Sequence, residues 1–344
     1  MSDDLLDVEL SDRPEEGNKK KRLRDRWLLL SVVGVLGLIL IVAIAIAGWY
    51  GKSVLDALNS MDRDSSLMPD RDGRPPVVVA KKGTEHPPLN IVLMGTDARS
   101  ADERGRSDVL MVFHLNGDRD EGYLISFPRD LWVDIPGHQI AKINAAYSWG
   151  GTALTIETLE QLLDVPMDHA AVTDFTGFAN VIDAVDGVTV HNETHFTAHN
   201  FDFPEGDVEL DGQRALAFVR ERKTLPKGDL SRAEHQRDVL EAVAAKMISK
   251  GVLASPRKFR DSVTTLGSNL VVDQSLDNDT LIKLGRSLDL TSPNDIHAFQ
   301  APTDGFGTSS DKQSYLKVHE EQLAELAEAM KTDTVDEYVD KYES

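Results

Sequence analysis

The sequence predicts a layered α/β or α+β domain with a central sheet, preceded by one transmembrane helix. Three observations carry this prediction: a long charge-free stretch near the N-terminus, continuous apolar runs at Leu89–Met94 and Val109–Leu115, and alternating strand-like and helix-like segments after them. Continuous apolar runs are typical of strands that are covered on both faces. Strands that alternate with helices favour a sheet packed between helical layers.

The charge-free stretch Trp27–Tyr50 is long enough to cross a bilayer. Its 24 residues would span roughly 36 Å as a helix, with aromatic rings at both ends where such rings favour the membrane interface. A cleaved signal peptide is the alternative, but its apolar region is usually shorter, about 7–15 residues. Six basic residues within Lys19–Arg26 precede the span, so the positive-inside rule places the N-terminus in the cytoplasm and the rest outside.

Composition excludes several other classes of protein. The net charge of −21 over 344 residues argues against a nucleic-acid surface, because binding to phosphate backbones needs a basic face. Cysteine is absent, so no disulfide, thiolate nucleophile or cysteine-bound zinc is possible.

The pattern along the chain predicts five segments. Residues 1–26 are expected to be a disordered cytoplasmic tail, and 51–88 an extracytoplasmic linker with a short strand at Val77–Val79. The folded domain is expected over 89–330, followed by a C-terminal tail at 331–344.

Within the domain, apolar spacing predicts the order of the elements. Extended segments are expected at Gly122–Phe127, Leu131–Ile135, His169–Thr173 and Gly187–Val190. Helices are expected at Asn144–Leu163 (interrupted by Gly150-Gly151), Phe175–Val185, Asp211–Val219, Leu230–Ile248 and about Gln313–Met330.

Two aspartates follow or begin neighbouring predicted strands. Asp97 lies in Gly95-Thr96-Asp97-Ala98-Arg99, and Asp108 lies in Gly105-Arg106-Ser107-Asp108. Carboxylates placed in this way suit Mg²⁺ or another hard cation. The alternative is that both shape turns or cap elements, as aspartates near Gly and Ser commonly do.

Arginines gather at the ends of the same predicted elements. They are Arg99, Arg106, Arg129, Arg220, Arg222 and Arg232. Guanidinium groups bind phosphate oxygens in a bidentate way, so several of them beside a metal site could hold a diphosphate. The alternative is pairing with neighbouring carboxylates, such as Arg129 with Asp130 or Arg222 with Glu221.

Other catalytic patterns are absent from the sequence. There is no nucleophile elbow, HExxH motif or P-loop. His191, His195 and His199 are spaced by four residues, as zinc ligands can be, but their surroundings indicate a long polar loop. The apolar segments Thr173–Val190 and Ala215–Val219 are expected to be core, with the lining of a lipid pocket as the alternative.

Seven segments closely resemble the LytR–CpsA–Psr family of bacterial envelope proteins. They are NIVLMGTDARS, GRSDVLMVFHL, SFPRDLWVDIPG, KINAAYSWGG, DFTGFANVIDAVDGVTV, LDGQRALAFVRER and GDLSRAEHQR, spread over about Leu89–Met247. The resemblance implies an αβα layered domain with a central mixed sheet and a hydrophobic pocket for a polyprenyl chain. It also implies a cell-membrane protein of a Gram-positive-type bacterium.

The activity implied by the resemblance is Mg²⁺-dependent transfer of a glycopolymer from a polyprenyl-diphosphate carrier to peptidoglycan. Asp97 and Asp108 would bind the metal, and Arg129, Arg220 and Arg222 the diphosphate. The residues that would line the same substrate site are Arg99, Arg106, Lys142, Asn144, Asp229, Arg232 and Gln236. A non-catalytic polyprenyl-phosphate-binding membrane protein, acting in recruitment or signalling, is the alternative.

The chain departs from the family's pattern at one place. Where relatives often have Arg-Gln-Gln, this chain has His235-Gln236-Arg237. Gln236 is retained, but the positive charge is displaced, which puts that edge of the site in question. The general base is also unassigned, with Asp130 as one candidate.

Overall fold

The computed structural model describes residues 51–69, 73–96, 107–247, 249, 251 and 254–343. The chain divides into two units, Met1–Lys52 and Ser53–Ser344, and the fold described below belongs to the second. Within the described ranges, no helix combines the length and apolar character needed to cross a membrane. The span expected at Trp27–Tyr50, and the tail before it, lie outside those ranges.

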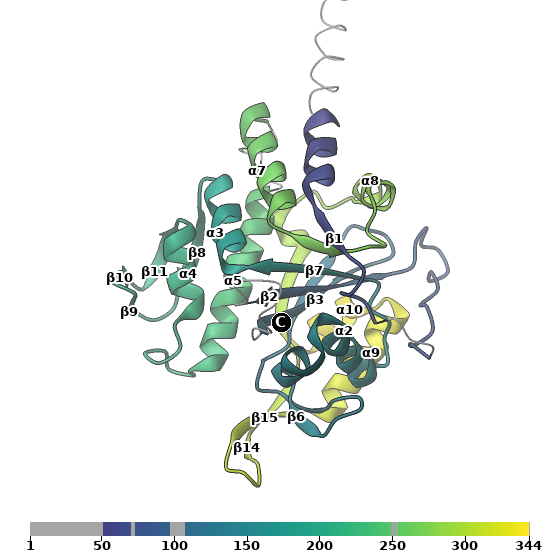
Figure 1. Ribbon diagram of the computed structural model, residues 1–344, viewed down its shortest axis with the longest axis vertical. Helices are drawn as coiled ribbons and strands as arrows, with labels where there is room; N and C mark the ends of the chain where they lie inside the picture. Colours follow the sequence, from purple (N-terminus) through teal and green to yellow (C-terminus); the bar gives the residue numbers. More distant parts are fainter. Residues whose placement is uncertain are drawn as a thin grey trace, which may run out of the picture. The chain divides into compact units, whose positions relative to one another are not determined.

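A seven-stranded mixed sheet forms the centre of the domain, in the order β1-β12-β7-β2-β3-β4-β13 (Figure 1). The strands are β1 (Asp62–Asp64), β2 (Leu89–Thr96), β3 (Ser107–Leu115), β4 (Gly122–Ser126), β7 (His169–Asp174), β12 (Val271–Asp273) and β13 (Ile296–Gln300). Central strand β2 runs parallel to β7 and antiparallel to β3, whereas β13 runs parallel to β4. The predicted central mixed sheet is therefore confirmed.

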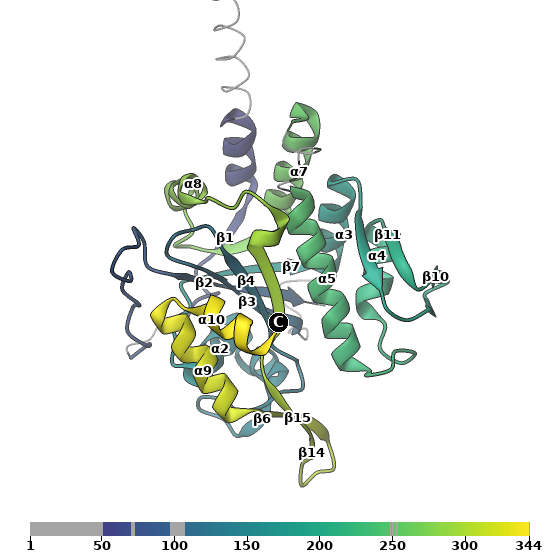
Figure 2. The same ribbon diagram turned by 180° about the vertical axis from the view of Figure 1, so that it is seen from behind.

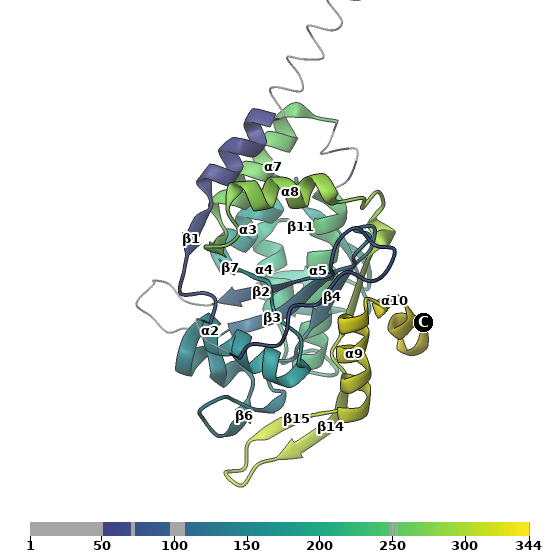
Figure 3. The same ribbon diagram turned by 90° about the vertical axis from the view of Figure 1, so that its right-hand side faces the viewer.

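Helices cover both faces of this sheet (Figure 3). The first face carries α2 (Asn144–Leu163), α9 (Glu320–Thr332) and α10 (Val335–Tyr342), and of these α9 and α10 are nearest the viewer in Figure 2. The second face carries α3 (Phe175–Ala184) on β7 and α5 (Asp229–Met247) on β4 and β13. Helix α4 (Gly212–Arg220) packs against both of these helices, and α7 (Pro256–Ser268) packs against α3. Helix α8 is Asn278–Ser287.

Four short two-stranded sheets flank the central one. They are β5 (Trp132–Asp134) with β6 (Ile140–Lys142), β8 (Val188–Asn192) with β11 (Gly206–Leu210), β9 (Phe196–Ala198) with β10 (Phe201–Phe203), and β14 (Thr303–Thr308) with β15 (Ser314–Val318). The segment predicted to be a long polar loop is thus two nested hairpins. The prediction failed because Phe196, Phe203 and Val208, which are buried, are separated by polar residues on the outer faces.

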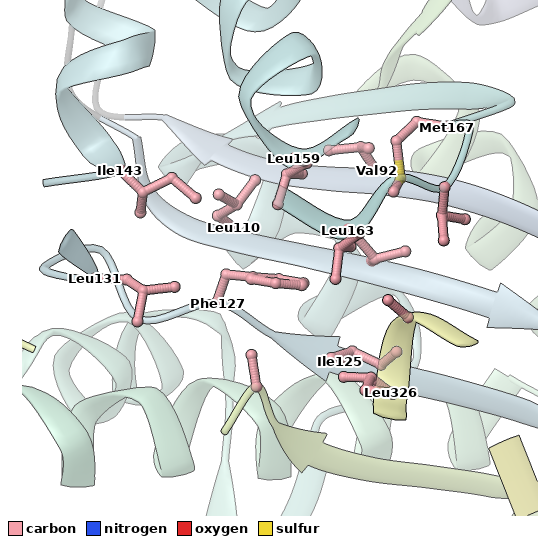
Figure 4. Packing of buried hydrophobic residues seen from close by; sticks show 14 of the residues in the cluster. Val92, Leu110, Ile125, Phe127, Leu131, Ile143, Leu159, Leu163, Met167 and Leu326 are labelled. Atoms are coloured by element: carbon pink, nitrogen blue, oxygen red, sulfur yellow. The ribbon is translucent and has the colours of Figure 1, made fainter. Parts of the chain in front are cut away.

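The main core lies on the first face (Figure 4). Val92 and Ile125 point from the sheet toward Leu159 of α2 and Leu326 of α9, and all four side chains are fully buried. Burying such side chains supplies the apolar contribution that offsets the conformational entropy lost on folding. The sheet is thereby held as a rigid platform for residues at its edges.

Most predicted elements of the domain are confirmed. Strands β2, β3, β4 and β7 and helices α2, α3, α4 and α5 lie within a few residues of their expected positions. The predicted interruption of α2 is present at Gly151, whose φ of 68° and ψ of −157° are not helical. Such a backbone conformation is accessible almost only to glycine.

Two predicted elements are wrong. The helix expected from Gln313 begins only at Glu320, because Ser314–Val318 pairs with β14 as strand β15. The strand expected at Val77–Val79 is not regular structure, and the two valines are 76% and 82% exposed.

Part of the segment expected to be a linker is integrated into the fold. Strand β1 pairs with β12 at the edge of the sheet. The Arg74 guanidinium donates to the Glu160 carboxylate of α2 over 2.7 Å, and the Glu160 side chain is fully buried. The domain therefore begins well before residue 89.

Candidate functional site

Three arginines converge on a single carboxylate. Arg129 lies in the turn that follows β4, while Asp229 is the first residue of α5. The Asp229 carboxylate lies 3.2 Å from Arg129 Nη2, 3.0 Å from Arg232 Nη2 and 3.7 Å from Arg222 Nη1. We call these three side chains the arginine cluster. The structure thus brings together four of the residues that the sequence predicts for the substrate site.

The positive charges of the arginine cluster favour the ionised form of the Asp229 carboxyl. Partial burial would raise the pKa of Asp229, but the guanidinium groups of Arg232 and Arg129 outweigh burial and hold that pKa below its usual value. The Arg232 side chain is only 8% exposed, so little solvent screens its charge. Three guanidinium groups that converge on one carboxylate are an arrangement that suits the binding of an anion.

A second ion pair lies beside the cluster. Lys142 Nζ is 3.0 Å from Asp130 Oδ1, and the backbone N–H of Asn144 donates to the carbonyl of Arg129 over 3.2 Å. The backbone N–H of Leu316 donates to the Asp130 carbonyl over 2.9 Å. The Arg129-Asp130 turn is therefore fixed by α2 on one side and by β15 on the other.

These residues line a small cleft. Its walls are Leu110, Met111, Ser126, Phe127, Pro128, Arg129, Asp130, Asp229, Arg232, Ala233, Gln236 and Leu316. The cavity volume is ≈ 20 Å³, room for about one water molecule, while the Asp229 carboxylate occupies the space between the arginines. An anionic ligand would therefore have to take over the contacts that Asp229 now makes.

Of two further predicted residues, Gln236 lines this cleft and Arg220 contacts the start of α3. Gln236 donates to the carbonyl of Val219 over 3.3 Å. The Arg220 guanidinium carbon lies 3.7 Å from the ring centroid of Phe175 at the start of α3, a cation–π contact. Sequence spacing gave no signal for the contact with Phe175, because 45 positions separate the two residues. A role for Arg220 in binding diphosphate stays a prediction.

The displaced charge at Arg237 remains close to the cleft. Arg237 Nη1 donates to Ser126 Oγ over 3.1 Å, and Ser126 is one of the cleft's walls. His235, two residues before Arg237, stacks on Phe218 with 4.0 Å between the ring centroids, and burial lowers the pKa of that histidine. The departure from the family's pattern therefore moves the positive charge to the sheet side of the cleft. Ser126 is a site residue that the sequence analysis does not assign.

The predicted metal site lies mostly outside the described residues. Asp97, Arg99 and Arg106 fall in the undescribed segment 97–106, and Asp108 lies in β3 without a described side chain. Thr96 at the end of β2 pairs with Ser107 at the start of β3. The backbone therefore brings the two flanking positions together at one edge of the sheet, as the sequence predicts.

No group of three metal-ligating side chains occurs elsewhere in the part of the chain that the structure describes. His191 Nδ1 lies 3.0 Å from Asp207, and His195 Nε2 lies 2.8 Å from Asp202, each across an exposed hairpin. The zinc alternative for the histidine series thus has no support in this geometry.

An apolar strip on the second face of the sheet leads away from the cleft. Ile91 and Leu93 of β2 and Val109 and Phe113 of β3 are only half-buried, whereas the alternate side chains on the first face are fully buried. Their neighbour Met111 pairs with Leu93 and also lines the cleft. Helix α5 covers β4 and β13, and α3 covers β7, so this strip lies between the two helices.

The fold and the site together define a layered α/β protein with an arginine cluster and an apolar strip beside one cleft. Comparison with known proteins makes this more specific. The chain matches the sequence model of the LytR_cpsA_psr family over residues 57–332. It belongs to this family.

Several known proteins are similar to this chain over most of its length. A polyisoprenyl-teichoic acid–peptidoglycan teichoic acid transferase, TagU, of Enterococcus faecalis (strain ATCC 700802 / V583) is 32% identical over 86% of this chain and 95% of that protein. The protein of the same name from Bacillus mycoides (strain KBAB4) is 35% identical over 78% of this chain and 88% of that protein. The crystal structure of B. subtilis TagV superposes with a TM-score of 0.63 at 26% identity, covering 73% of this chain and 98% of that one. TagT bound to LI-WTA gives a TM-score of 0.57 at 28% identity, covering 72% and 91%.

Proposed function

We propose that this protein transfers a glycopolymer from a polyprenyl-diphosphate carrier to peptidoglycan. The observation that carries the proposal is the convergence of Arg129, Arg222 and Arg232 on one carboxylate at the cleft. Guanidinium groups arranged in this way match the several oxygens of a diphosphate. The relatives named as teichoic acid transferases support both the donor class and the acceptor.

The apolar strip supplies a place for the polyprenyl chain. Its half-buried members Ile91, Leu93 and Phe113 lie on the same face of the sheet as Met111, which borders the cleft. A lipid tail that covers these side chains would gain about 25 cal/mol for each Å² of apolar surface removed from water. The diphosphate would then lie at the arginine cluster with its tail along β2 and β3.

The reaction that fits this arrangement is a direct phosphoryl transfer. A hydroxyl oxygen of the acceptor glycan forms a bond to the phosphorus that carries the glycopolymer, and the bridging P–O bond of the diphosphate breaks. Its electron pair leaves with the polyprenyl phosphate. The hydroxyl proton passes to a carboxylate at the cleft, and we assign it to Asp130. The guanidinium groups around Asp229, the other carboxylate there, lower its pKa and so disfavour its protonation.

The main catalytic contribution of these residues would be electrostatic. Phosphoryl transfer depends mainly on positioning and on stabilising charge that develops on the phosphoryl oxygens and the leaving group. Arg129 and Arg232 are largely shielded from solvent, so their charges are weakly screened. Turns fixed by α2 and β15 hold Arg129 in place before the substrate arrives.

Asp97 and Asp108 fit a Mg²⁺ ion by their chemistry. The paired backbone at Thr96 and Ser107 supports their placement at one sheet edge, and two carboxylates are a common protein contribution to a Mg²⁺ site. When bound, the ion would neutralise charge on the diphosphate oxygens.

The membrane span at Trp27–Tyr50 would place this chemistry at the outer surface of the cell membrane. The basic run before it favours an N-terminus in the cytoplasm. A single-pass anchor would keep the domain beside the leaflet that holds a lipid-linked donor.

Transfer of labelled glycopolymer to peptidoglycan by the full chain tests the proposal. Arg129→Ala is expected to reduce the rate at least about 100-fold, since loss of one charged hydrogen-bond donor to a transition state costs about 3 kcal/mol. Arg129→Lys retains the positive charge but lacks the bidentate guanidinium group, so this variant is expected to keep a transfer rate between those of wild type and Arg129→Ala. Arg257→Ala removes an exposed arginine on α7 and serves as the control.

Two results would count against the proposal. The first is full transfer by a double variant with Arg129→Ala and Arg222→Ala. The second is a wild-type protein that retains co-purified polyprenyl phosphate but never turns over with acceptor and Mg²⁺. The second result would favour a lipid-binding protein without catalysis.

A further inference from the structure

A groove lies between the two hairpins that project from the first-face side of the domain. Hairpins β5–β6 and β14–β15 lie next to each other in Figures 1 and 3, and β5 packs against β15. The groove has a volume of ≈ 730 Å³. We call it the hairpin groove, and the residues that matter below are Trp132, Asp134, Asp304, Tyr315, Glu320 and Glu321.

Two stacked aromatic rings form its centre. The ring centroids of Trp132 and Tyr315 are 4.4 Å apart with an interplanar angle of 21°, and both side chains are only half-buried. Their chain neighbours Leu131 and Leu316 are buried and joined by a β-bridge. The backbone that carries the aromatic pair is therefore held in place, while part of the surface of the two rings is accessible to a ligand.

Polar groups around the pair are mostly acidic. Four carboxylates line the groove against one lysine, Lys317. Glu320 and Glu321 form the first turn of α9 and are exposed, as are Asp134 and Asp304. Such carboxylates accept hydrogen bonds from hydroxyl groups but repel an anionic polymer.

Aromatic faces and hydrogen-bond acceptors together match one ligand class, the pyranose rings of a glycan. One face of a pyranose presents C–H groups, which pack on an aromatic ring, while its rim carries hydroxyls. A polymer linked by phosphodiesters would pack no better on the aromatic rings, and its negative charges would be repelled by the four carboxylates. The groove therefore suits an uncharged glycan strand.

A short chain of contacts links the hairpin groove to the cleft. Trp132 pairs with Lys142 across β5 and β6, and directly opposed residues of an antiparallel pair share a face. Lys142 in turn lies 3.0 Å from the Asp130 carboxylate, which lines the cleft. A sugar on the aromatic pair would therefore lie beside the residue that we assign as the base.

The position of the groove also agrees with the stereochemistry of phosphoryl transfer. Attacking and leaving oxygens lie roughly in line on opposite sides of the phosphorus. The apolar strip for the leaving polyprenyl phosphate is on the second face of the sheet, whereas the groove is built from first-face elements such as α9. An acceptor held in the groove would thus approach from the side opposite the leaving group.

We infer that the hairpin groove is the binding site for the acceptor glycan strand, with a pyranose ring stacked on the Trp132–Tyr315 pair. This inference rests on the proposed function, because it names the acceptor's site in that reaction. Exposed apolar side chains at Phe306 (63%) and Ile140 (54%) extend the two hairpins beyond the pair. They offer further packing surface to a longer strand.

The test is a calorimetric titration of the full chain in detergent with a soluble peptidoglycan tetrasaccharide whose muramic acid carboxyls are capped as amides, so that the glycan is uncharged. Trp132→Leu and Tyr315→Leu retain apolar volume but lose the aromatic faces. Each is expected to weaken binding about tenfold, the effect of 1.4 kcal/mol. Trp149→Leu replaces a half-buried tryptophan outside the groove, whose ring centroid lies 4.8 Å from that of His138, and is expected to bind as wild type.

Carboxylate variants on α9 provide an independent pair. Glu321→Gln is expected to change affinity for the glycan, whereas Glu328→Gln, exposed on the same helix but not in the groove, is not. A wild-type affinity for the tetrasaccharide in both aromatic variants would overturn the inference. Equal loss of affinity for the lipid-linked donor would also overturn it, because the groove would then belong to the donor.

Kinetics separate this inference from the function on which it rests. If transfer occurs, the aromatic variants are expected to raise KM for the acceptor about tenfold with kcat nearly unchanged. Transfer with an unchanged acceptor KM would contradict the groove's role alone. Binding of the glycan at the groove by a chain that never transfers would contradict the proposed function alone.

Discussion

Replacement of Asp229 by asparagine tests how the cleft is held before substrate binds. The change keeps the shape of the side chain but removes the negative charge that Arg129, Arg222 and Arg232 share. Breaking a buried ion pair costs about 3–5 kcal/mol, whereas exposed pairs contribute about 0–1 kcal/mol. Asp229 is 28% exposed and Arg232 only 8%, so we expect a loss of about 1–3 kcal/mol in the free energy of unfolding.

The pH dependence gives this prediction its internal control. Asp229 has a lowered pKa in the folded protein, so its stabilising effect is fully present above the unfolded value of about 3.9. The effect is lost as the pH falls through the lowered folded value. The stability difference between wild type and Asp229→Asn should therefore be constant near neutral pH and shrink in acid.

The assay is urea unfolding monitored by circular dichroism, at several pH values and with and without inorganic pyrophosphate. Because Asp229 occupies the space between the arginines, Asp229→Asn should be stabilised more by pyrophosphate than wild type is. Equal stability of the two proteins at pH 7, together with equal stabilisation by pyrophosphate, would show that Asp229 neither stabilises the arginine cluster nor competes with an anion there.

Three further changes test other parts of the structure. His114 is fully buried, and burial lowers its pKa to about 3. Because the unfolded histidine takes up a proton near pH 6.5, the free energy of unfolding of wild type should fall by about 1.4 kcal/mol per pH unit below that pH. A His114→Gln variant should lose this slope in urea titrations, and a variant that keeps it would contradict the prediction. Arg74→Ala removes the ion pair between Arg74 and the buried Glu160 carboxylate and should lower the free energy of unfolding by about 2–4 kcal/mol. An unchanged urea midpoint would show that Arg74 does not stabilise the fold. Gly151→Ala should cost about 1–3 kcal/mol because of its backbone conformation, measured by thermal unfolding beside Gly285→Ala on α8, whose added methyl meets open space.

Local patterns were sufficient to predict much of the fold. Continuous apolar runs identify β2 and β3 because both faces of the sheet are covered, and paired glycines identify the break in α2. Strand β15 was not predictable in this way. Tyr315, Leu316 and Val318 have a spacing that also suits a helix, and only pairing with β14 decides between the two.

The candidate site was predictable in its residue types more than in its contacts. Aspartates and arginines at element ends pointed to a phosphate site, and Arg129, Arg222, Arg232 and Asp229 do meet. Which carboxylate they share could not be deduced, since Arg129 and Asp229 are 100 positions apart. The nearest acidic neighbour in sequence, Asp130, instead forms its closer ion pair with Lys142.

In the proposed function, the arginine cluster binds the diphosphate of a lipid-linked donor. The most direct measurement is the affinity of the full chain for a short-chain polyprenyl diphosphate, compared between wild type, Arg129→Ala, Arg232→Ala and the control Arg257→Ala. Each lost charged hydrogen bond is worth about 1.5–3 kcal/mol, so both cluster variants should bind about 10–100 times more weakly, with the control unchanged. Equal affinity in all four proteins would contradict the account.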